Sequence, residues 1–405
     1  MKRIRAGLRN RRKAGQTLLL FTFFLVVLIL LVGMGIDLSF AYITRARLSK
    51  AVDAACLAGI DNYWRGKDAA TAIASNAFAV NYGTSGRDAI APRPTPVFTT
   101  DASNNTTLKV TASSQINTFF IRVLPSWRTM TVASTAESLR AHVIMSIVLD
   151  RSGSMGDTAP GFPHNGMYYL HGAVTNFINY FDDGVDRAAQ VSFSNCARID
   201  VAMQKPFKQK ITTAALALDP ENWTAAAPGM ATGWDQVNNF TPTSGEVVQR
   251  VIVFFTDGIA NTFSNKFTCG IRNVAPGPEL HDPSSCGTLS CSGVGSGTTV
   301  PSVNPAYTGL ANIRLNNTGD MEKEAEARTL VFANQARAAG TYVYCIGLSY
   351  SPGEVNADFL AKVANVDGIV SQDQPIGLAL IAPDGPQLHE AFRTIAKAIL
   401  LRLTR

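Results

Sequence analysis

The stretch VIMSIVLDRSGSMG, residues 143–156, decides the fold of this chain. Six of its first seven residues are apolar, and the run stops at Asp150, which is followed by Ser152, Gly153 and Ser154. A short continuous apolar run is typical of a parallel strand that is buried on both faces. The sequence therefore predicts a buried strand over residues 143–149, with a carboxylate and two hydroxyls at its carboxyl end.

A second apolar run ends in the same way. The stretch RVIVFFT, residues 250–256, is followed by Asp257 and Gly258. Because ligands gather at the carboxyl ends of the strands in such sheets, we expect the two aspartates to share one rim. Two neighbouring carboxylates repel each other, and a hard cation bound between them removes the repulsion. The hydroxyls of Ser152 and Ser154 would add oxygen ligands of the kind that Mg²⁺ or Mn²⁺ prefers.

Strands and helices alternate over the rest of this region. The stretches AAQVSFS (188–194) and TYVYCIGL (341–348) predict two further strands. A helix is predicted over residues 321–339, because acidic residues occupy its first turn and a glycine follows its end. The last 20 residues, 386–405, predict an amphipathic helix. This rhythm predicts a doubly wound, mostly parallel α/β sheet over residues 142–405.

The six cysteines fit an oxidising compartment. A long irregular insertion, residues 261–320, carries three of them, Cys269, Cys286 and Cys291. A disulfide that ties down this insertion is one reading, and a zinc site that includes His281 is the other. The spacing contains no close C-x2-C pair, which favours the disulfide. Cys345, inside a predicted strand, is expected to be a small core residue.

The N-terminus predicts a membrane anchor. Residues 1–16 contain seven lysines and arginines and no acid, and residues 17–36 form an uncharged run of 20 residues. Removing those seven charges from the formal net charge of +6 leaves about −1, so the body offers no basic face for nucleic acid. The run is long enough to cross a bilayer and longer than the apolar part of a cleaved signal peptide, the alternative. The basic cluster is expected to stay in the cytoplasm, with the bulk of the chain in the periplasm, outside the inner membrane.

Two segments separate the anchor from the sheet. Residues 37–65 lack proline and keep helical spacing, so they are expected to continue the membrane helix outwards. Residues 66–141 predict a small α+β module, with one helix followed by strands in which β-branched residues roughly alternate. This module contains no titratable cluster and is interpreted as a spacer.

The motif Asp150-Arg151-Ser152-Gly153-Ser154 resembles the D-x-S-x-S signature of von Willebrand factor A domains. In that family the signature belongs to a metal-ion-dependent adhesion site, or MIDAS, together with a threonine and a later T-D-G. Here the T-D-G is Thr256-Asp257-Gly258, and Thr232 in GMATGWDQV best matches the threonine, with Thr224 and Thr241 as rivals. The resemblance implies that Mg²⁺ or Mn²⁺ is bound by Asp150, Ser152, Ser154, Thr232 and Asp257.

The N-terminal segment is similar to that of TadG-like proteins, which assemble the Flp (tight adherence) pilus. The similarity lies in the basic stretch before Gly15-Gln16, the apolar span, Gly35-Ile36-Asp37, and the run AVDAACLAG at 51–59. Many members of that family carry a von Willebrand factor A domain after the anchor. Related pilins are cleaved after a glycine and carry a glutamate five residues on, where this chain has Leu20, so pilin-type processing is not expected.

Together these features predict a membrane-anchored protein that binds other proteins through a metal, in pilus assembly or attachment, and that is not an enzyme. The expected partner is an envelope or pilus-assembly protein that offers an acidic side chain to the metal. The alternative is an envelope hydrolase or transferase with a catalytic metal, and a third possibility is a scaffold whose metal site is vestigial. The sequence contains no G-x-x-x-x-G-K phosphate loop and no G-x-S-x-G nucleophile elbow.

Overall fold

The computed structural model describes residues 2–83, 88–123, 125–221, 223–265, 275–276, 298–301, 312–315, 318–351 and 353–402. The chain divides into two compact units. Unit 1 comprises Met1–Thr100 and Thr106–Arg140, and unit 2 comprises Asp101–Asn105 and Ala141–Arg405. The short segment Asp101–Asn105 therefore joins two strands of unit 1 but packs with unit 2.

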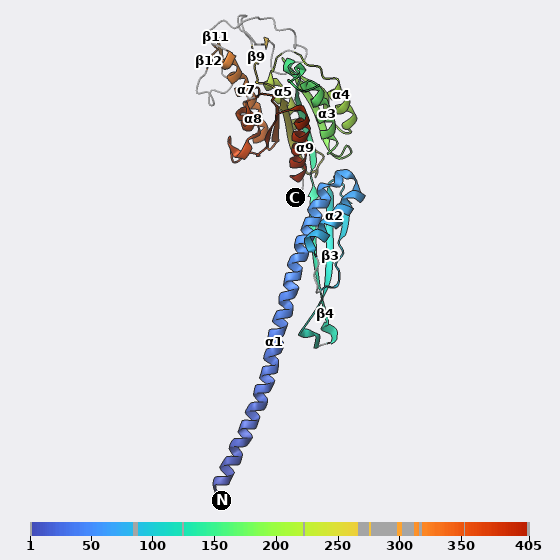
Figure 1. Cartoon of the computed structure of the whole chain (residues 1–405), viewed down its shortest axis with the longest axis vertical. Helices are drawn as coiled ribbons and strands as arrows, with labels where there is room; N and C mark the ends of the chain where they lie inside the picture. Colours follow the sequence, from blue (N-terminus) through green and yellow to red (C-terminus); the bar gives the residue numbers. More distant parts are fainter. Residues whose placement is uncertain are drawn as a thin grey trace. The chain divides into compact units, whose positions relative to one another are not determined.

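Unit 1 begins with one uninterrupted helix, α1, which spans Lys2–Asp61 and is drawn in blue in Figure 1. Nearly all side chains from Leu18 to Ile36 are exposed and apolar. Among the described residues, the Leu18–Asp61 part of this helix is the one candidate that is long and apolar enough to cross a membrane. The helix runs on without a break beyond residue 36 to Asp61.

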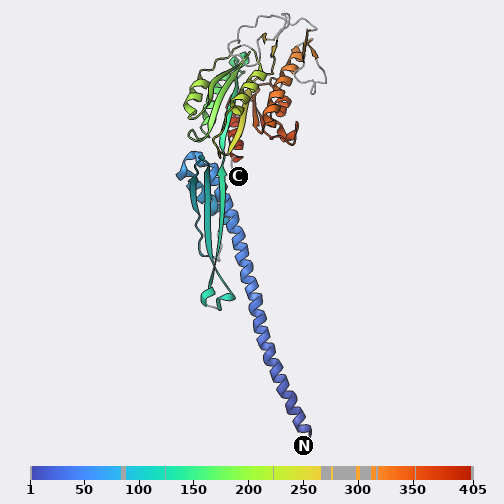
Figure 2. The ribbon, with the colours of Figure 1, turned by 180° about the vertical axis from the view of Figure 1, so that it is seen from behind.

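The rest of unit 1 is the helix α2 and an antiparallel sheet (Figure 2). Strand β3 pairs with β4 along its whole length on one edge, and with β2 and then β1 on the other. The bounds are α2 Lys67–Tyr82, β1 Asp88–Ile90, β2 Thr95–Thr100, β3 Thr106–Asn117 and β4 Thr129–Arg140. The expected α+β composition of this region is what the structure contains.

One hydrophobic core holds unit 1 together. Val52 and Cys56 of α1 pack with Phe78 of α2 and with Leu108 and Val110 of β3, and all five are buried. The sequence-based division at residue 65 thus separates segments that share a core, because α1 and α2 cover the same face of the sheet. Residues 48–60 of α1, which were predicted to continue the anchor, therefore contribute to the core of the predicted spacer module.

Unit 2 is built on a six-stranded sheet in the order β14-β13-β8-β5-β6-β7. All neighbouring strands are parallel except the edge pair β6 and β7. The bounds are β5 His142–Asp150, β6 Arg187–Phe193, β7 Ala197–Gln204, β8 Val248–Thr256, β13 Tyr342–Leu348 and β14 Ala379–Ala382. The predicted doubly wound, mostly parallel sheet is confirmed, and the four strands expected from apolar runs are β5, β6, β8 and β13.

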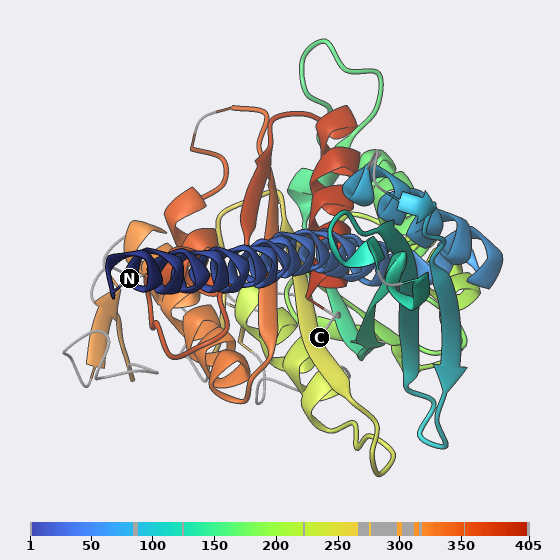
Figure 3. The ribbon, with the colours of Figure 1, turned by 90° about the horizontal axis from the view of Figure 1, so that it is seen from below.

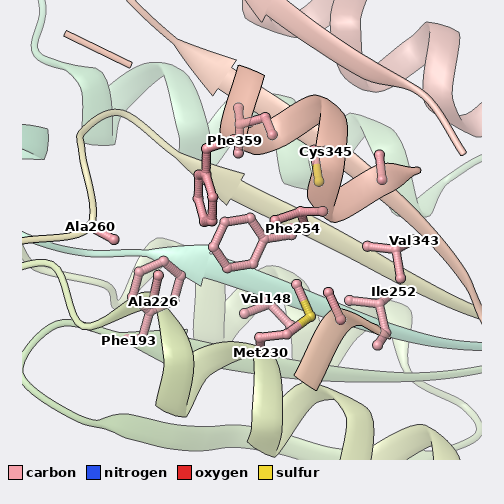
Figure 4. Close-up of a cluster of buried hydrophobic side chains, with 14 of the residues drawn as sticks. Val148, Phe193, Ala226, Met230, Ile252, Phe254, Ala260, Val343, Cys345 and Phe359 are labelled. Carbon is pink, nitrogen blue, oxygen red and sulfur yellow. The ribbon is translucent and has the colours of Figure 1, made fainter. Parts of the chain in front are cut away.

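Helices cover both faces of this sheet. On one face Val148, Phe254 and Cys345 belong to a buried cluster that also includes residues of α5, α7 and α8 (Figure 4). On the other face Phe255 contacts Phe392 of α9. Figure 3 shows the red α9 and the yellow-green α5 on opposite sides of the sheet. The bounds are α3 Gly166–Ile178, α4 Lys208–Leu216, α5 Ala226–Asn238, α7 Thr318–Ala338, α8 Ala357–Ala364 and α9 Gly385–Leu401.

The strand order creates a topological switch point. The chain passes from β5 to β6 on one side and returns to β8 on the other side of β5. Loops that leave the carboxyl ends of β5 and β8 therefore diverge, and such crevices are where open α/β sheets bind ligands. Both predicted aspartates lie at this edge of the sheet, Asp150 as the last residue of β5 and Asp257 directly after β8.

The insertion lies largely outside the described residues. Within it the structure describes four short strands, β9 Ser264–Asn265, β10 Ala275–Pro276, β11 Thr298–Pro301 and β12 Asn312–Leu315. Cys269, Cys286, Cys291 and His281 are outside the described residues. Cys196 is disulfide-bonded, and Cys345 is a free, fully buried core residue, as expected.

Candidate metal centre

The centre begins with Asp150, whose side chain is fully buried at the end of β5. One of its carboxylate oxygens accepts a hydrogen bond from the backbone N–H of Ser152, at 2.8 Å. The other accepts a hydrogen bond from the hydroxyl of Thr256, at 2.5 Å. These bonds fix the carboxylate between the two strand ends and turn the loop so that the following serines face β8.

The two serines of the motif meet the second aspartate. The Oγ atoms of Ser152 and Ser154 are 3.2 Å apart, and they lie 3.4 Å and 2.9 Å from Oδ1 of Asp257. In an octahedral Mg²⁺ shell with metal–oxygen distances of about 2.1 Å, adjacent ligand oxygens are about 3 Å apart. The three oxygens therefore have the spacing of ligands on one octahedral face.

The structure does not bring Thr232 to this group. Thr232 lies inside α5, six residues after its first residue, or about 9 Å along the helix. Its neighbour Gly233 lies against the middle of β5, where an added Cβ would come within 2.3 Å of the Val148 side chain. Among the described hydrogen bonds, none joins Thr232 to Asp150, Ser152, Ser154 or Asp257, so its position inside α5 does not support the predicted place among the ligands.

Thr224, one of the two rivals, lies nearer to this group. It is buried in the loop that leads into α5. A Cβ added to Gly258 would lie 3.7 Å from the Ser154 hydroxyl and 3.8 Å from the Thr224 hydroxyl. Both hydroxyls therefore face the same small space beside the T-D-G turn, and the Thr224 oxygen is available to the centre.

The Thr224 loop is held on both sides. The backbone of Thr224 exchanges two hydrogen bonds with Asn261, one to the Asn261 side chain at 2.9 Å and one from the Asn261 backbone at 3.1 Å. Arg151, inside the D-x-S-x-S motif, forms an ion pair with Glu221 of the same loop. Sequence reasoning missed Asn261 and Glu221. Their one signal in the sequence is position, because Glu221 lies three residues before Thr224 and Asn261 lies four residues after Asp257.

The misplacement of the threonine follows from where α5 begins. The stretch GMATGWDQV lies inside α5, which already begins at Ala226. Pro228 is in the first turn, where a helix tolerates proline because the N–H has no intrahelical partner. Gly229 and Gly233 allow α5 to approach Phe193 and Val148 closely. Proline and glycine are typical of loops, but here Pro228, Gly229 and Gly233 belong to a helix, and the two glycines let it pack closely on the sheet.

Electrostatics favour a bound cation. Burial raises the pKa of the Asp150 carboxyl. Burial, and then the nearby charge of Asp150, raise the pKa of Asp257 well above its usual value. Two carboxylates in such a place are costly when both are ionised, and a divalent cation would neutralise them. The donor set, two carboxylates and three hydroxyls, is the oxygen-only set that Mg²⁺ and Mn²⁺ prefer, so these residues fit the metal.

Tyr350 is a further residue beside this centre. Its hydroxyl is buried and has no hydrogen-bond partner among the described residues. Burial, followed by the charges of Tyr169 and Asp257, raises the pKa of Tyr350 to about 12. The phenol is therefore neutral at physiological pH and has a free O–H to donate.

Comparisons with known proteins agree with the N-terminal resemblance. Residues 15–74 match the family model described as "Putative Flp pilus-assembly TadE/G-like". The similarity of this segment to TadG-like proteins is thereby confirmed. No curated protein sequence matches the chain.

Solved structures with a similar course of the chain include a mutant of the PilB minor pilin from Streptococcus sanguinis, at 15% identity and a TM-score of 0.44, covering 79% of this chain and 81% of that chain. They also include the vWF domain of the type V pili tip protein Mfa5 from Porphyromonas gingivalis, at 15% identity and a TM-score of 0.42. That match covers 66% of this chain and 97% of the Mfa5 chain. A conserved hypothetical protein, BatB from Bacteroides thetaiotaomicron, matches at 14% identity and a TM-score of 0.35. That match covers 64% of this chain and 99% of the BatB chain.

Proposed function

We propose that this protein is a membrane-anchored component of pilus assembly or attachment that binds a partner protein through a divalent metal. The observation that carries the proposal is the meeting of Asp150, Ser152, Ser154, Thr224 and Asp257 at one edge of the sheet. The matched TadE/G-like segment supports the pilus context.

The metal proposed here is Mg²⁺ or Mn²⁺, and its task is recognition. Five protein oxygens, some acting through water, leave an octahedral ion with at least one position open to solvent. A carboxylate of the partner would fill that position, and attraction between a cation and a carboxylate is strong and geometrically selective.

The anchor proposed here is the apolar part of α1, residues 17–36. The seven cations before it would stay in the cytoplasm, and the rest of the chain would lie in the periplasm. This arrangement would hold the metal centre outside the inner membrane, where pilus and envelope proteins are accessible. A binding role needs no general base, so we infer that the protein is not an enzyme.

Capture of a partner should depend on the metal and on carboxylates. The full chain in nanodiscs is incubated with an envelope extract in Mg²⁺, or in EDTA, and captured proteins are identified by mass spectrometry. A second portion of the extract is first treated with carbodiimide and glycinamide, which neutralises its carboxylates. We expect capture from the untreated extract in Mg²⁺, and its loss with EDTA, with the amidated extract and with Asp150→Asn.

The matched control for that experiment is Asp157→Asn, because Asp157 is an exposed aspartate seven residues along the chain. It should capture as much partner as the unchanged protein. Equal capture in Mg²⁺ and in EDTA would show that the metal centre is not the binding surface.

A further inference from the structure

The turn between β3 and β4 exposes a cluster of apolar side chains. The described residues of this turn, 119–123 and 125–128, are called the hairpin tip below. The exposed fractions of Phe119, Val123 and Trp127 are 51%, 74% and 53%. The tip also carries two exposed arginines, Arg122 and Arg128, and no acidic residue. Aromatic and apolar side chains beside arginines are the composition of segments that lie in a membrane interface.

The hairpin tip is fixed to α1 by one buried carboxylate. Asp37 of α1 is 2% exposed and accepts hydrogen bonds from the backbone N–H groups of Phe119, Phe120 and Ile121, each at 2.9 Å. A Cβ added to Gly33 would lie 2.5 Å from Phe120, so the missing side chain of this glycine makes room for the ring. The tip therefore lies against α1 over residues 33–37.

That position coincides with the end of the apolar part of α1. Residues 17–36 rise about 30 Å along the helix, which is the thickness of a hydrocarbon core. Gly33 lies about 4.5 Å inside the outer end of this run, and Asp37 is the first charged residue beyond it. If the run crosses a bilayer, the hairpin tip is at the boundary between acyl chains and headgroups.

The length of the hairpin sets this position. A Cβ added to Gly59 of α1 would lie 2.5 Å from the Leu108 side chain of β3, so the two residues are close neighbours. Further along, Ile116 of β3 is in a buried cluster with Ala41 of α1. The eight residues of strand from 108 to 116 extend about 26 Å, and the 18 residues of helix from 41 to 59 extend about 27 Å. Strand and helix thus run alongside each other (Figure 1), and twelve-residue strands are long enough for the turn to reach the apolar run.

We propose that the hairpin tip is a second membrane contact, which inserts Phe119, Val123 and Trp127 into the outer interface of the bilayer that α1 crosses. This proposal rests on the membrane anchor proposed above. A bilayer is favoured as the occupant because the tip lies against the outer end of the exposed apolar run of α1, and because the two arginines suit anionic headgroups. Two contacts on one rigid unit would fix the tilt and rotation of the helix, which a single span leaves free.

The test places an environment-sensitive fluorophore, NBD, at single cysteines of the full chain. The variants are Val123→Cys at the tip, Val80→Cys as the matched control, and Ile29→Cys in the apolar run. Val80 is an 82% exposed valine of α2 in the same unit, and Ile29 is 53% exposed. Each protein is reconstituted into phosphatidylcholine–phosphatidylglycerol vesicles that carry a nitroxide at carbon 5 or carbon 12 of the acyl chain. The unchanged chain, taken through the same labelling, gives the background from native cysteines.

We expect the carbon-5 nitroxide to quench NBD at residue 123 at least about twofold, and more strongly than the carbon-12 nitroxide, because interfacial side chains lie about 5–10 Å below the surface. NBD at residue 29 should be quenched more by carbon 12, and NBD at residue 80 by neither. Unquenched, water-exposed NBD at 123 together with quenched NBD at 29 would overturn the tip proposal and leave the anchor intact. Blue-shifted but unquenched NBD at 123 would mean that protein covers the tip, which overturns the proposal as well. Unquenched NBD at 29 would overturn the anchor and the tip proposal together.

Discussion

The change Asp150→Asn is expected to abolish all stabilisation by Mg²⁺. In the unchanged protein a metal that binds only the folded state should raise the free energy of unfolding by about 2.7 kcal/mol at a Mg²⁺ concentration about 100 times the Kd. The amide of asparagine has the shape of the carboxylate and can still accept the Ser152 N–H bond, so the fold should persist. It lacks the charge that attracts the cation. Thermal unfolding of the full chain in detergent, with and without Mg²⁺, measures the difference.

Without metal the same variant should be no less stable than the unchanged protein. The asparagine side chain would remove the repulsion between two buried carboxylates, and that repulsion is uncompensated when no cation is present. Asp157→Asn, the exposed control, should keep the full response to Mg²⁺. A response of normal size in Asp150→Asn would place the metal elsewhere.

The second large effect is expected at the opposite edge of the sheet. The side chain of Glu246 is 2% exposed, and its Oε1 atom lies 2.6 Å from Nδ1 of His142 and 2.7 Å from the guanidinium of Arg187. The other ring nitrogen of His142 lies 2.8 Å from the carbonyl oxygen of Asn104. The Glu246 carboxylate therefore lies between the His142 ring and the Arg187 guanidinium, in a place almost closed to water.

The change Glu246→Gln should lower the free energy of unfolding by about 3–5 kcal/mol, the cost of leaving the buried guanidinium of Arg187 without its ionic partner. The pKa of Glu246 is lowered from 4.5 to about 2; burial opposes this, and the hydrogen bonds from Arg187, Thr243 and His142 outweigh it. A carboxyl whose folded pKa is depressed stabilises the fold above pH 4.5 and loses this effect as the pH falls towards 2. Urea unfolding of the full chain between about pH 2 and pH 7 should show this loss in the unchanged protein and not in Glu246→Gln.

Glu390→Gln is the matched control for the buried glutamate. Glu390 pairs with Arg393 three residues away on α9, and both side chains are about half exposed. Such an exposed pair contributes little to the free energy of unfolding, so Glu390→Gln should leave it nearly unchanged. A loss of less than about 1 kcal/mol in Glu246→Gln would mean that the buried cluster is replaceable by neutral hydrogen bonds.

Much of unit 2 was predictable because its strands are buried on both faces. Short apolar runs such as VIMSIVL and RVIVFFT predict buried parallel strands. The aspartates that follow these runs are therefore expected at the carboxyl edge of the sheet. The edge strands β7 and β14 were not predicted. Strand β7 is half exposed and contains Arg198 and Asp200, and β14 has only four residues, so neither has an apolar run long enough to recognise.

The threonine of the centre shows where local patterns fail. Thr224 and Thr232 both lie between the two aspartates, and the choice depends on where α5 begins. That beginning is decided by tertiary packing, since Gly229 lies against Phe193 and Gly233 against Val148. The hairpin tip was likewise invisible to sequence patterns, because the contact between Asp37 and residues 119–121 joins segments more than 80 residues apart.

The number of Mn²⁺ ions bound per chain, measured by electron paramagnetic resonance, tests the metal centre most directly. The unchanged chain should bind about one Mn²⁺ that Mg²⁺ displaces, as an oxygen-only site does. Asp150→Asn should bind none, and Thr224→Val should weaken binding at least about tenfold, a loss of about 1.4 kcal/mol. Thr232→Val should bind Mn²⁺ as the unchanged chain does. Normal binding in Asp150→Asn, or weakening by Thr232→Val and not by Thr224→Val, would contradict the centre described here.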